Sequence, residues 1–372
     1  MQFEVSKSSL VKILSNVSGA VERKNTIPIL LNVKIEARAG KVDFTTTDMD
    51  IVITSTISDA NIKTEGATTI PAQLLLDIVR KIPDGVNIDL LISEDGNQAI
   101  IKYNKSKFSL PCLDAIEFPT LSEGEMTHDF IIEAKELARI IDKSRFAISS
   151  DETRYYLNGL YIHIAKNDEG KFELKAVATD GHRLALSSYA NDNFDKEIPG
   201  VIIPKKTINE IRRIIEDEDN VKVSLSNSKI KIKCSNCTIV SKLIDGQFPE
   251  YDKVVPKNND KTININKKTI FDAIDRVATV ANDKHRTIKL NLESGKIQLQ
   301  VSSSDGGFAD EEVEVDFSGD KIEAGFNSRY LLEIINQLDS NDINLKFNDS
   351  FSPVIVDSAD LKGLYVIMPV RV

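Results

Sequence analysis

Residues 70–82 read IPAQLLLDIVRKI, and the chain returns to this pattern as IPKKTINEIRRII at residues 203–215 and as FNSRYLLEIINQL at residues 326–338. In each copy apolar residues follow at helical spacing, and an acid stands seven residues after the opening apolar residue. Proline near the start of the first two copies suits the beginning of a helix. The pattern therefore predicts one amphipathic helix in each third of the chain.

Further elements recur with this helix. An alternating strand runs into a helical pattern at residues 3–14, 130–141 and 263–274, and hairpin-like segments around glycine turns follow it. A strand-end pair also recurs, as Thr47-Asp48, Thr179-Asp180 and Ser304-Asp305. Each third thus reads as a strand, a helix, three strands, a second helix and two or three strands. Helices isolated among antiparallel strands predict an α+β fold of three repeated domains, at residues 1–126, 127–255 and 256–372.

The composition is typical of a chain that folds in water. The sequence has 372 residues, of which 41% are hydrophobic and 28% are charged. No apolar run approaches the ~18 residues of a membrane-spanning helix, and the start lacks the layout of a signal peptide. Three cysteines, Cys112, Cys234 and Cys237, are too few for a disulfide framework. We therefore expect a cytoplasmic protein without membrane contact.

Positive charge gathers on the predicted helices. Over the six helical segments, the lysines and arginines exceed the acids by eight, whereas the whole chain has a formal net charge of −10. This distribution favours a surface that holds phosphate backbones without reading bases, although a charged helix face is also typical of plain solvation. A closed ring of six helices would leave a central hole only ~7 Å in diameter. A ring of twelve helices would leave a hole ~24 Å in diameter, which is wide enough for duplex DNA. A head-to-tail dimer could therefore encircle DNA.

Motifs of nucleotide binding and catalysis are missing from the sequence. Neither a phosphate-binding loop nor a dinucleotide fingerprint is present, so no cofactor is expected. The C-x-x-C pair Cys234 and Cys237 lacks a second pair for zinc, and we interpret it as a strand and turn with no metal. Asp180 and His182 could form an acid and base pair, but no nucleophile accompanies them. We interpret Asp180 and Gly181 instead as a turn, in which glycine supplies a positive φ.

Four motifs closely resemble the bacterial DNA polymerase III β subunit family, the sliding clamps. They are RYYLNG (154–159), ATDGHRL (178–184), SKLIDGQFP (241–249) and YVIMPVR (365–371), and the resemblance covers the full length with the three repeats in register. It implies a non-catalytic processivity factor, a homodimeric ring of six domains with helices lining the pore. Its partners would be duplex DNA, the polymerase III α subunit, the clamp loader δ subunit, and other polymerases and repair proteins that carry clamp-binding peptides.

The resemblance also implies site residues. The partner-peptide pocket would comprise Leu157, Thr179, Gly181, His182, Arg183, Leu184, Pro249, Lys253, Val254, Asn327, Tyr330, Phe351, Met368, Pro369, Val370 and Arg371. Apolar walls with a few polar groups suit an inserted Leu or Phe anchor. Lys253 and Val370 depart from the residues that are common in the family, so the peptide preference is expected to shift.

DNA contacts and a ring joint follow in the same way. The resemblance places DNA contacts at Lys24, Tyr155, Lys205, Lys206 and Arg286. Tyr155 and Tyr156 could equally lie in the core, and we favour an exposed Tyr155. Gln73 and Leu74 stand where the family can have basic residues, which puts their pore role in doubt. A basic edge near Lys105, Lys107, Phe108 and Leu110 would meet an acidic edge near Ile274, Val280, Glu311 and Glu312. The alternative is a β-rich binding scaffold whose basic helices are merely solvated.

Overall fold

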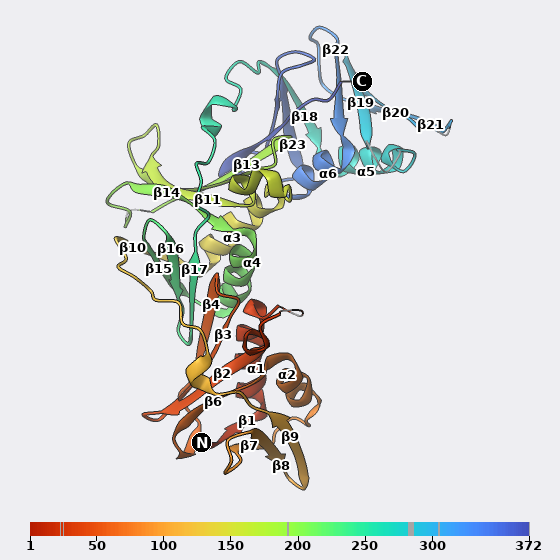
Figure 1. Cartoon of the computed structure of the whole chain (residues 1–372). Helices are drawn as coiled ribbons and strands as arrows, with labels where there is room; N and C mark the ends of the chain where they lie inside the picture. Colours follow the sequence, from red (N-terminus) through yellow and green to blue (C-terminus); the bar gives the residue numbers. More distant parts are fainter. Residues whose placement is uncertain (23, 25, 192, 282–285, 304–305, 372) are drawn as a thin grey trace. The chain divides into compact units, whose positions relative to one another are not determined.

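The computed structural model describes residues 1–372 except 23, 25, 192, 282–285, 304–305 and 372 (Figure 1). All six predicted helices are present among the described residues. They are α1 (Lys7–Val17), α2 (Ala72–Lys81), α3 (Ala134–Ser144), α4 (Lys205–Ile214), α5 (Lys267–Ala278) and α6 (Ser328–Asn336). Ser6 caps the start of α1 and Asn266 caps the start of α5, and their side chains accept from the backbone N–H groups of Ser9 and Thr269. These caps satisfy donors that the first helical turn leaves unpaired.

The strands repeat with the helices. The first third holds β1 (Gln2–Ser6), β2 (Asn32–Arg38), β3 (Lys41–Thr47), β4 (Ile51–Ile57), β5 (Asn61–Thr64), β6 (Gly66–Pro71), β7 (Asn87–Ile92), β8 (Gln98–Tyr103) and β9 (Ser106–Pro111). The middle third holds β10 (His128–Glu133), β11 (Gly159–Lys166), β12 (Phe172–Thr179), β13 (Arg183–Ala190), β14 (Ile198–Pro204), β15 (Asn220–Leu225), β16 (Lys229–Lys233) and β17 (Cys237–Lys242). The last third holds β18 (Lys261–Asn266), β19 (Thr287–Glu293), β20 (Lys296–Ser302), β21 (Phe308–Glu314), β22 (Ile322–Asn327), β23 (Asp342–Phe347), β24 (Val354–Asp357) and β25 (Gly363–Ile367).

The predicted number of strands between the two helices of each third is wrong. In the middle and last thirds, four strands lie between the two helices instead of three. The first third has five, because it also contains the short strand β5. The overlooked strands are β6, β14 and β22, which run directly into α2, α4 and α6. Their apolar residues therefore read as the start of the helix. Each pairs antiparallel with the first strand after the preceding helix, β2, β11 or β19.

The sheets join neighbouring thirds edge to edge. One eight-stranded sheet has the order β10-β15-β16-β17-β4-β3-β2-β6, and the other has the order β14-β11-β12-β13-β25-β24-β23-β18. We call the β4–β17 pairing the first joint and the β13–β25 pairing the second joint. Two further sheets, β5-β1-β7-β8-β9 and β21-β20-β19-β22, join no other third. Their outermost strands β9 and β21 correspond to the strands that pair at the joints.

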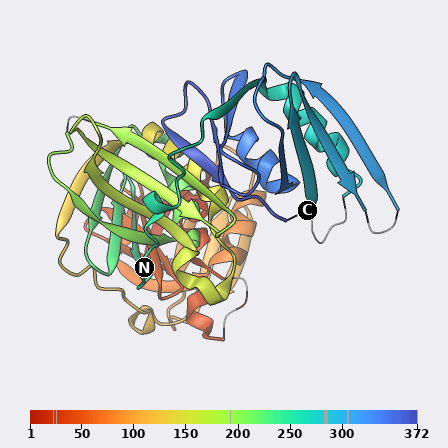
Figure 2. The ribbon, with the colours of Figure 1, turned by 90° about the horizontal axis from the view of Figure 1, so that it is seen from above.

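The joints divide the chain into two compact units. The first unit comprises residues 1–138 and 206–243 and contains the first joint, whereas the second unit comprises residues 139–205 and 244–372 and contains the second joint. The middle third is therefore shared between the units, because each of its sheets continues into a neighbour. In the second unit, α5 packs along β20 and β21 (Figures 1 and 2).

The predicted turn before β13 is confirmed. Gly181 has a φ of +86°, and the backbone N–H groups of His182 and Arg183 donate to Asp180 Oδ1 at 2.9 and 3.1 Å. Asp48 accepts from its own turn in the same way, although Met49 there takes the positive φ. The third copy, Ser304-Asp305, lies outside the described residues.

The interior of each unit is apolar. The largest fully buried side chains include Phe3, Phe44, Phe326, Phe347 and Tyr365. None of the described helices is long and apolar enough to cross a membrane.

Ile53 at the first joint tests the contribution of edge pairing to stability. Its buried side chain lies in β4 opposite Ile239 of β17. We expect Ile53→Ala to lower the free energy of unfolding by about 2–5 kcal/mol, because the cavity remains after the methyl groups are removed. Urea unfolding followed by circular dichroism measures the change. The control is Ile131→Ala on the exposed face of β10, and equal effects of the two changes would contradict the role of the joint.

Candidate functional site

The end of the chain is tied to the second joint. Leu184 of β13 lies opposite Val366 of β25, and the Met368 backbone N–H donates to the His182 carbonyl at 2.8 Å. The Val370 N–H then donates to the Gly325 carbonyl, also at 2.8 Å. The last residues described in the structure are therefore held by strand-type hydrogen bonds, so their side chains stand at fixed places beside the joint.

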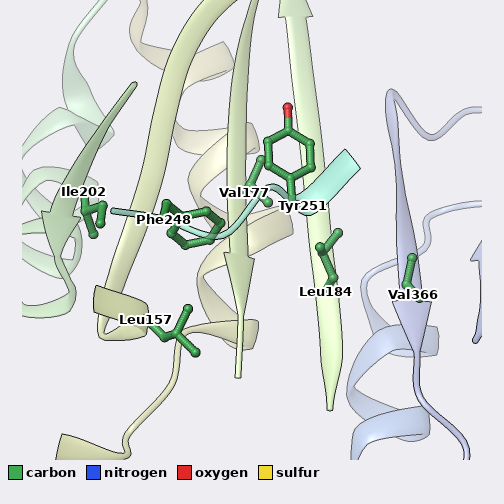
Figure 3. Close-up of a cluster of buried hydrophobic side chains, with 7 residues drawn as sticks. All are labelled: Leu157, Val177, Leu184, Ile202, Phe248, Tyr251 and Val366. Atoms are coloured by element: carbon green, nitrogen blue, oxygen red, sulfur yellow. The ribbon is translucent and has the colours of Figure 1, made fainter. Parts of the chain in front are cut away.

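An apolar cluster covers one face of this joint. Leu157, Leu184 and Val366 pack with Val177, Ile202, Phe248 and Tyr251 (Figure 3). Phe248 and Tyr251 come from the segment that also carries Pro249, Lys253 and Val254. This segment bends because the Val254 N–H donates to the Tyr251 carbonyl at 2.9 Å, which leaves Pro249 and Val254 exposed at the rim. The site thus has a buried apolar floor and exposed apolar residues above it.

A buried arginine connects the pocket to α6. Arg183 lies between Asp180 and Glu333, with Nε 3.1 Å from Asp180 Oδ2 and Nη1 2.5 Å from Glu333 Oε2. Its Nη2 donates to the Phe146 carbonyl at 2.8 Å, and its guanidinium stacks 4.4 Å from the centre of the Tyr330 ring. Burial disfavours the charge of Glu333, but hydrogen bonds from Arg329 and Arg183 outweigh it and lower the pKa of that carboxyl. Arg183 is therefore a fixed structural cation.

A cavity of about 520 Å³ opens beside this network. Arg154, His182, Lys205 and Tyr330 are among its lining residues, and the His182 and Tyr330 rings stack with centroids 6.1 Å apart. Asn327 fixes the start of α6, because its side chain accepts from the Tyr330 backbone N–H at 3.3 Å. The mixture of rings and cations suits the polar and aromatic parts of a peptide.

A second cavity of about 540 Å³ lies along the bent segment. Pro249 and Lys253 line it together with Tyr161, His163 and Tyr251. His163 Nε2 and the Tyr251 hydroxyl lie 2.9 Å apart, and burial lowers the pKa of His163, because it disfavours the charged imidazole. The Lys253 side chain remains exposed and pairs only with Glu250 among the described residues.

The remaining predicted pocket residues differ in exposure. The Thr179 hydroxyl accepts from the Gly181 N–H at 3.1 Å and donates to the Arg183 carbonyl at 2.6 Å, which holds the turn closed. Pro369 is half-buried and Arg371 is exposed. Phe351 is 82% exposed on a loop that Asp349 stabilises, so its ring is free to meet a partner.

Neither interpretation of a chemical centre gains support from the geometry. Both Asp180 oxygens face the local backbone and Arg183, so this carboxylate does not orient the His182 ring as an acid and base pair requires. Cys234 and Cys237 close the β16–β17 hairpin through an N–H to carbonyl bond of 2.8 Å. Burial raises the pKa of the Cys234 thiol to about 12, which opposes the thiolate that zinc needs.

The predicted DNA contacts lie at separate places in the two units. Lys24 and Lys205 are exposed, and Tyr155 is 54% exposed while Tyr156 packs against the apolar cluster. Lys206 is different, because its ammonium lies 2.5 Å from Asp48 and 3.2 Å from the Ala20 carbonyl within the first unit. Arg286 is half-buried and has a φ of +44°. Lys206 therefore also holds α4 against the turn of Asp48.

The predicted ring edges are mostly on the surface. Lys105 and Lys107 are exposed on the β8–β9 hairpin, where Phe108 is half-buried and Leu110 is buried. Glu311 and Glu312 lie on β21 and pair with Arg276 and Lys296 of their own unit. One prediction is wrong: Ile274 is 0% exposed on the inner face of α5, so it belongs to the core. Val280, just beyond the helix, is the accessible residue there.

Sequence reasoning missed two features of the site. Glu333 was visible as the repeated acid, but its contact with Arg183 spans 150 positions, and no local pattern reveals it. Phe308 opens β21 with 61% of its surface exposed. A large apolar residue in an otherwise acidic strand was the available signal for an edge that meets a partner.

Comparisons with known proteins agree with this geometry. Models of the DNA polymerase III β subunit match the N-terminal domain at residues 1–122, the central domain at 131–250 and the C-terminal domain at 252–371. A β sliding clamp of Caulobacter vibrioides is 42% identical over the whole of both chains. Among solved structures, a Caulobacter crescentus sliding clamp has a TM-score of 0.95 with 42% identity and full coverage of both chains.

A further solved structure carries a ligand. The sliding clamp from Bartonella birtlesii bound to griselimycin has a TM-score of 0.95 and 41% identity, and the alignment covers all of both chains. Since all three domain models and these full-length relatives agree, the chain belongs to the family of the bacterial DNA polymerase III β subunit, the β sliding clamp, a non-catalytic processivity factor of DNA replication.

Proposed function

We propose that two copies of this chain close head to tail into a ring around duplex DNA and tether the replicative polymerase to it. The observation that carries the proposal is that β9 in the first third and β21 in the last, the counterparts of the strands paired at the joints, each lie at a sheet edge without a partner strand among the described residues. An edge strand exposes a row of unpaired backbone groups that another strand can complete. Head-to-tail pairing of unlike edges closes a ring. We keep three domains per copy, at residues 1–126, 127–255 and 256–372.

Opposite charge on the two edges supports this pairing. Lys105 and Lys107 are exposed beside β9, and none of the ion pairs among the described residues uses them. β21 offers Asp310, Glu311, Glu312 and Glu314. Charge complementarity at an interface favours correct pairing and disfavours the like pairings β9–β9 and β21–β21.

DNA contact in the ring would be weak and independent of sequence. Six helices carry the excess of cations, and Lys205 and Lys24 are exposed for phosphate contact. Nothing among the described elements resembles a base-reading helix, so phosphates supply the contact. The location would be the cytoplasm, where the bacterial chromosome is replicated.

The pocket at the second joint would take clamp-binding peptides. The apolar floor of Leu157, Leu184 and Val366, the rim at Pro249 and Val254, and the griselimycin-bound relative support a peptide site there. The partners would be the polymerase III α subunit, the clamp loader δ subunit, and other polymerases and repair proteins with such peptides. One site shared by many partners allows exchange between replication and repair.

Charge reversal tests the ring edge. Lys107→Glu should weaken the dimer roughly tenfold, because each ring has two joints and an exposed ion pair contributes about 0.5–1 kcal/mol. Adding Glu312→Lys should restore part of the affinity. Light scattering over a dilution series measures the mass, which is 41.3 kDa for one chain. A dimer that ignores both changes would remove β9 and β21 from the interface.

Lys205 tests the DNA surface. Lys205→Glu should reduce binding to duplex DNA of any sequence and lower the slope of log affinity against log salt by about 1 per lysine. Fluorescence anisotropy of labelled duplexes measures both quantities, with Lys41→Glu on the exposed start of β3 as the matched control. Lys206→Ala should instead lower stability, because it removes the contact with Asp48. Strong preference for one DNA sequence would argue against the ring.

Removal of residues 368–372 tests the pocket. A short peptide with Gln followed by Leu or Phe should bind the intact protein, with about 2 kcal/mol in each anchor, and should not bind the truncated protein. The truncation deletes Met368 and its bond to His182 but leaves β9 and β21 intact, so the dimer should persist. Isothermal titration measures the binding of the peptide, and Ile116→Ala, at an exposed site of the first unit, is the control. Equal affinity for both proteins would place the peptide site elsewhere.

The alternative, a scaffold that binds no DNA, makes opposite predictions for two of these tests. Such a protein would remain unaffected by Lys205→Glu, and its mass would not depend on Lys107.

A further inference from the structure

The second cavity, of about 540 Å³, borders the predicted peptide pocket and has a chemistry of its own. Pro249 and Lys253 line it, and both also belong to the predicted pocket. Leu157, Leu184 and Val366 of the apolar floor are not among its lining residues. A peptide anchored in the pocket therefore has this cavity within reach of the residues that flank its anchors.

A β-bulge in β14 forms one wall of the cavity. The register of β11 against β14 shifts between Ile162 and Ile164, where β14 carries one extra residue. Such a bulge bends the strand locally and redirects its side chains. Gly200 lies in this bulge, and a Cβ there would stand 1.9 Å from the Tyr161 hydroxyl oxygen. The absence of a side chain at Gly200 therefore gives Tyr161 its place at the wall.

Aromatic rings form a second wall. Tyr161 stacks on Phe248, with ring centroids 4.7 Å apart and an angle of 5° between the planes. The Tyr251 hydroxyl lies 2.9 Å from His163 Nε2, so these two polar groups satisfy each other. Among the described residues no hydrogen bond reaches the Tyr161 hydroxyl, which leaves it available to a ligand.

Asp252 brings a negative charge to this cavity. Its side chain is exposed there, and within the described part of the chain no hydrogen bond or ion pair reaches its carboxylate. The adjacent cation, Lys253, pairs with Glu250 instead. Burial raises the pKa of Tyr161 and the charge of Asp252 raises it further, so the carboxylate lies near this phenol. The cavity therefore combines aromatic rings, a hydroxyl and a carboxylate that no described cation contacts.

This combination suits a cationic side chain. A carboxylate attracts a cation, and the electron-rich face of an aromatic ring does so as well. Arginine fits better than lysine, because its planar guanidinium can bond a carboxylate through two N–H groups and stack on a ring. The chain already holds an arginine in this way, since the Arg183 guanidinium lies 4.4 Å from the Tyr330 ring centre and bonds Asp180 and Glu333.

We propose that this cavity binds an arginine side chain of a partner peptide whose Leu or Phe anchors occupy the neighbouring apolar pocket. Asp252 accepts hydrogen bonds from the guanidinium, and Tyr161 contacts it with its ring and hydroxyl. The inference rests on the proposed peptide pocket and adds to it the chemistry of a flanking residue. Partners without the arginine bind the same pocket less tightly, so the cavity ranks the partners that compete for one site.

A peptide series tests this preference with the full-length protein. The parent peptide carries Gln followed by Leu and Phe anchors in an otherwise uncharged sequence, and each variant carries one arginine at a single position before or after the anchors. Isothermal titration should find a position at which arginine tightens binding about fivefold over glutamine, because an exposed ion pair and a ring contact each contribute modestly.

Asp252→Asn separates the cavity from the general attraction of cations to a chain with a net charge of −10. It should abolish the preference for arginine and leave the affinity of the glutamine peptide unchanged. Asp168→Asn, at an exposed site that does not line the cavity, is the matched control and should change neither. Asp252→Arg should reverse the preference, so that a peptide with glutamate at this position binds more tightly than the arginine peptide.

The outcomes separate this inference from the pocket itself. Equal affinity for the arginine and glutamine peptides at every position would overturn the arginine site and leave the peptide pocket standing. A preference for arginine that survives Asp252→Asn would do the same. Failure of every peptide to bind would overturn the pocket and this inference with it.

Discussion

Edge-to-edge strand pairing is the constraint on which the structure depends. Every third of the chain builds two sheets, and a sheet edge leaves backbone N–H and C=O groups without partners. β4 with β17 and β13 with β25 satisfy these groups inside the chain, through eight-stranded sheets that pass from one third to the next. β9 and β21 have no such partner among the described strands. A second copy could complete both, and because β9 and β21 are the counterparts of the strands paired at the internal joints, the proposed assembly repeats a pairing that the chain already contains.

Side chains then distinguish the joints. Arg183 is buried between Asp180 and Glu333, and loss of one partner of such a buried network costs about 3–5 kcal/mol. The internal joints are also linked by the chain itself, so they are permanent. In the proposed ring, the joint between the two copies, where β9 would meet β21, is held by non-covalent contact alone. A loader could therefore open the ring there and leave the peptide pocket at the second joint intact.

Much of this was accessible from the sequence. The repeat at residues 70–82, 203–215 and 326–338 predicted three helices correctly, because apolar spacing and the repeated acid are local features. The strands β6, β14 and β22 were missed because their apolar residues merge with the following helix. The sharing of the middle third between two units was also invisible, since strand pairing across thirds is set by long-range contacts.

The site residues divide in the same way, between local features that the sequence predicts and long-range contacts that it does not. The turn at Asp180 and Gly181 was predicted from residue types that favour a positive φ and local bonds. Ile274 was misplaced because an apolar residue on a helix can face either the core or a partner, and only the structure shows it fully buried. Lys206 was assigned to DNA by the family resemblance, but its contact with Asp48 joins residues 158 positions apart, and no local pattern reveals it.

The topological link between ring and DNA is the claim that one measurement tests most directly. The protein is loaded by a clamp loader and ATP onto a closed circular plasmid, the complex is separated by gel filtration at high salt, and the plasmid is then cut once. The account predicts that the protein stays with the circle through the column and is lost from the linear DNA, because a ring can slide off a free end. Equal retention on circular and linear DNA would contradict encirclement and point to ordinary surface binding.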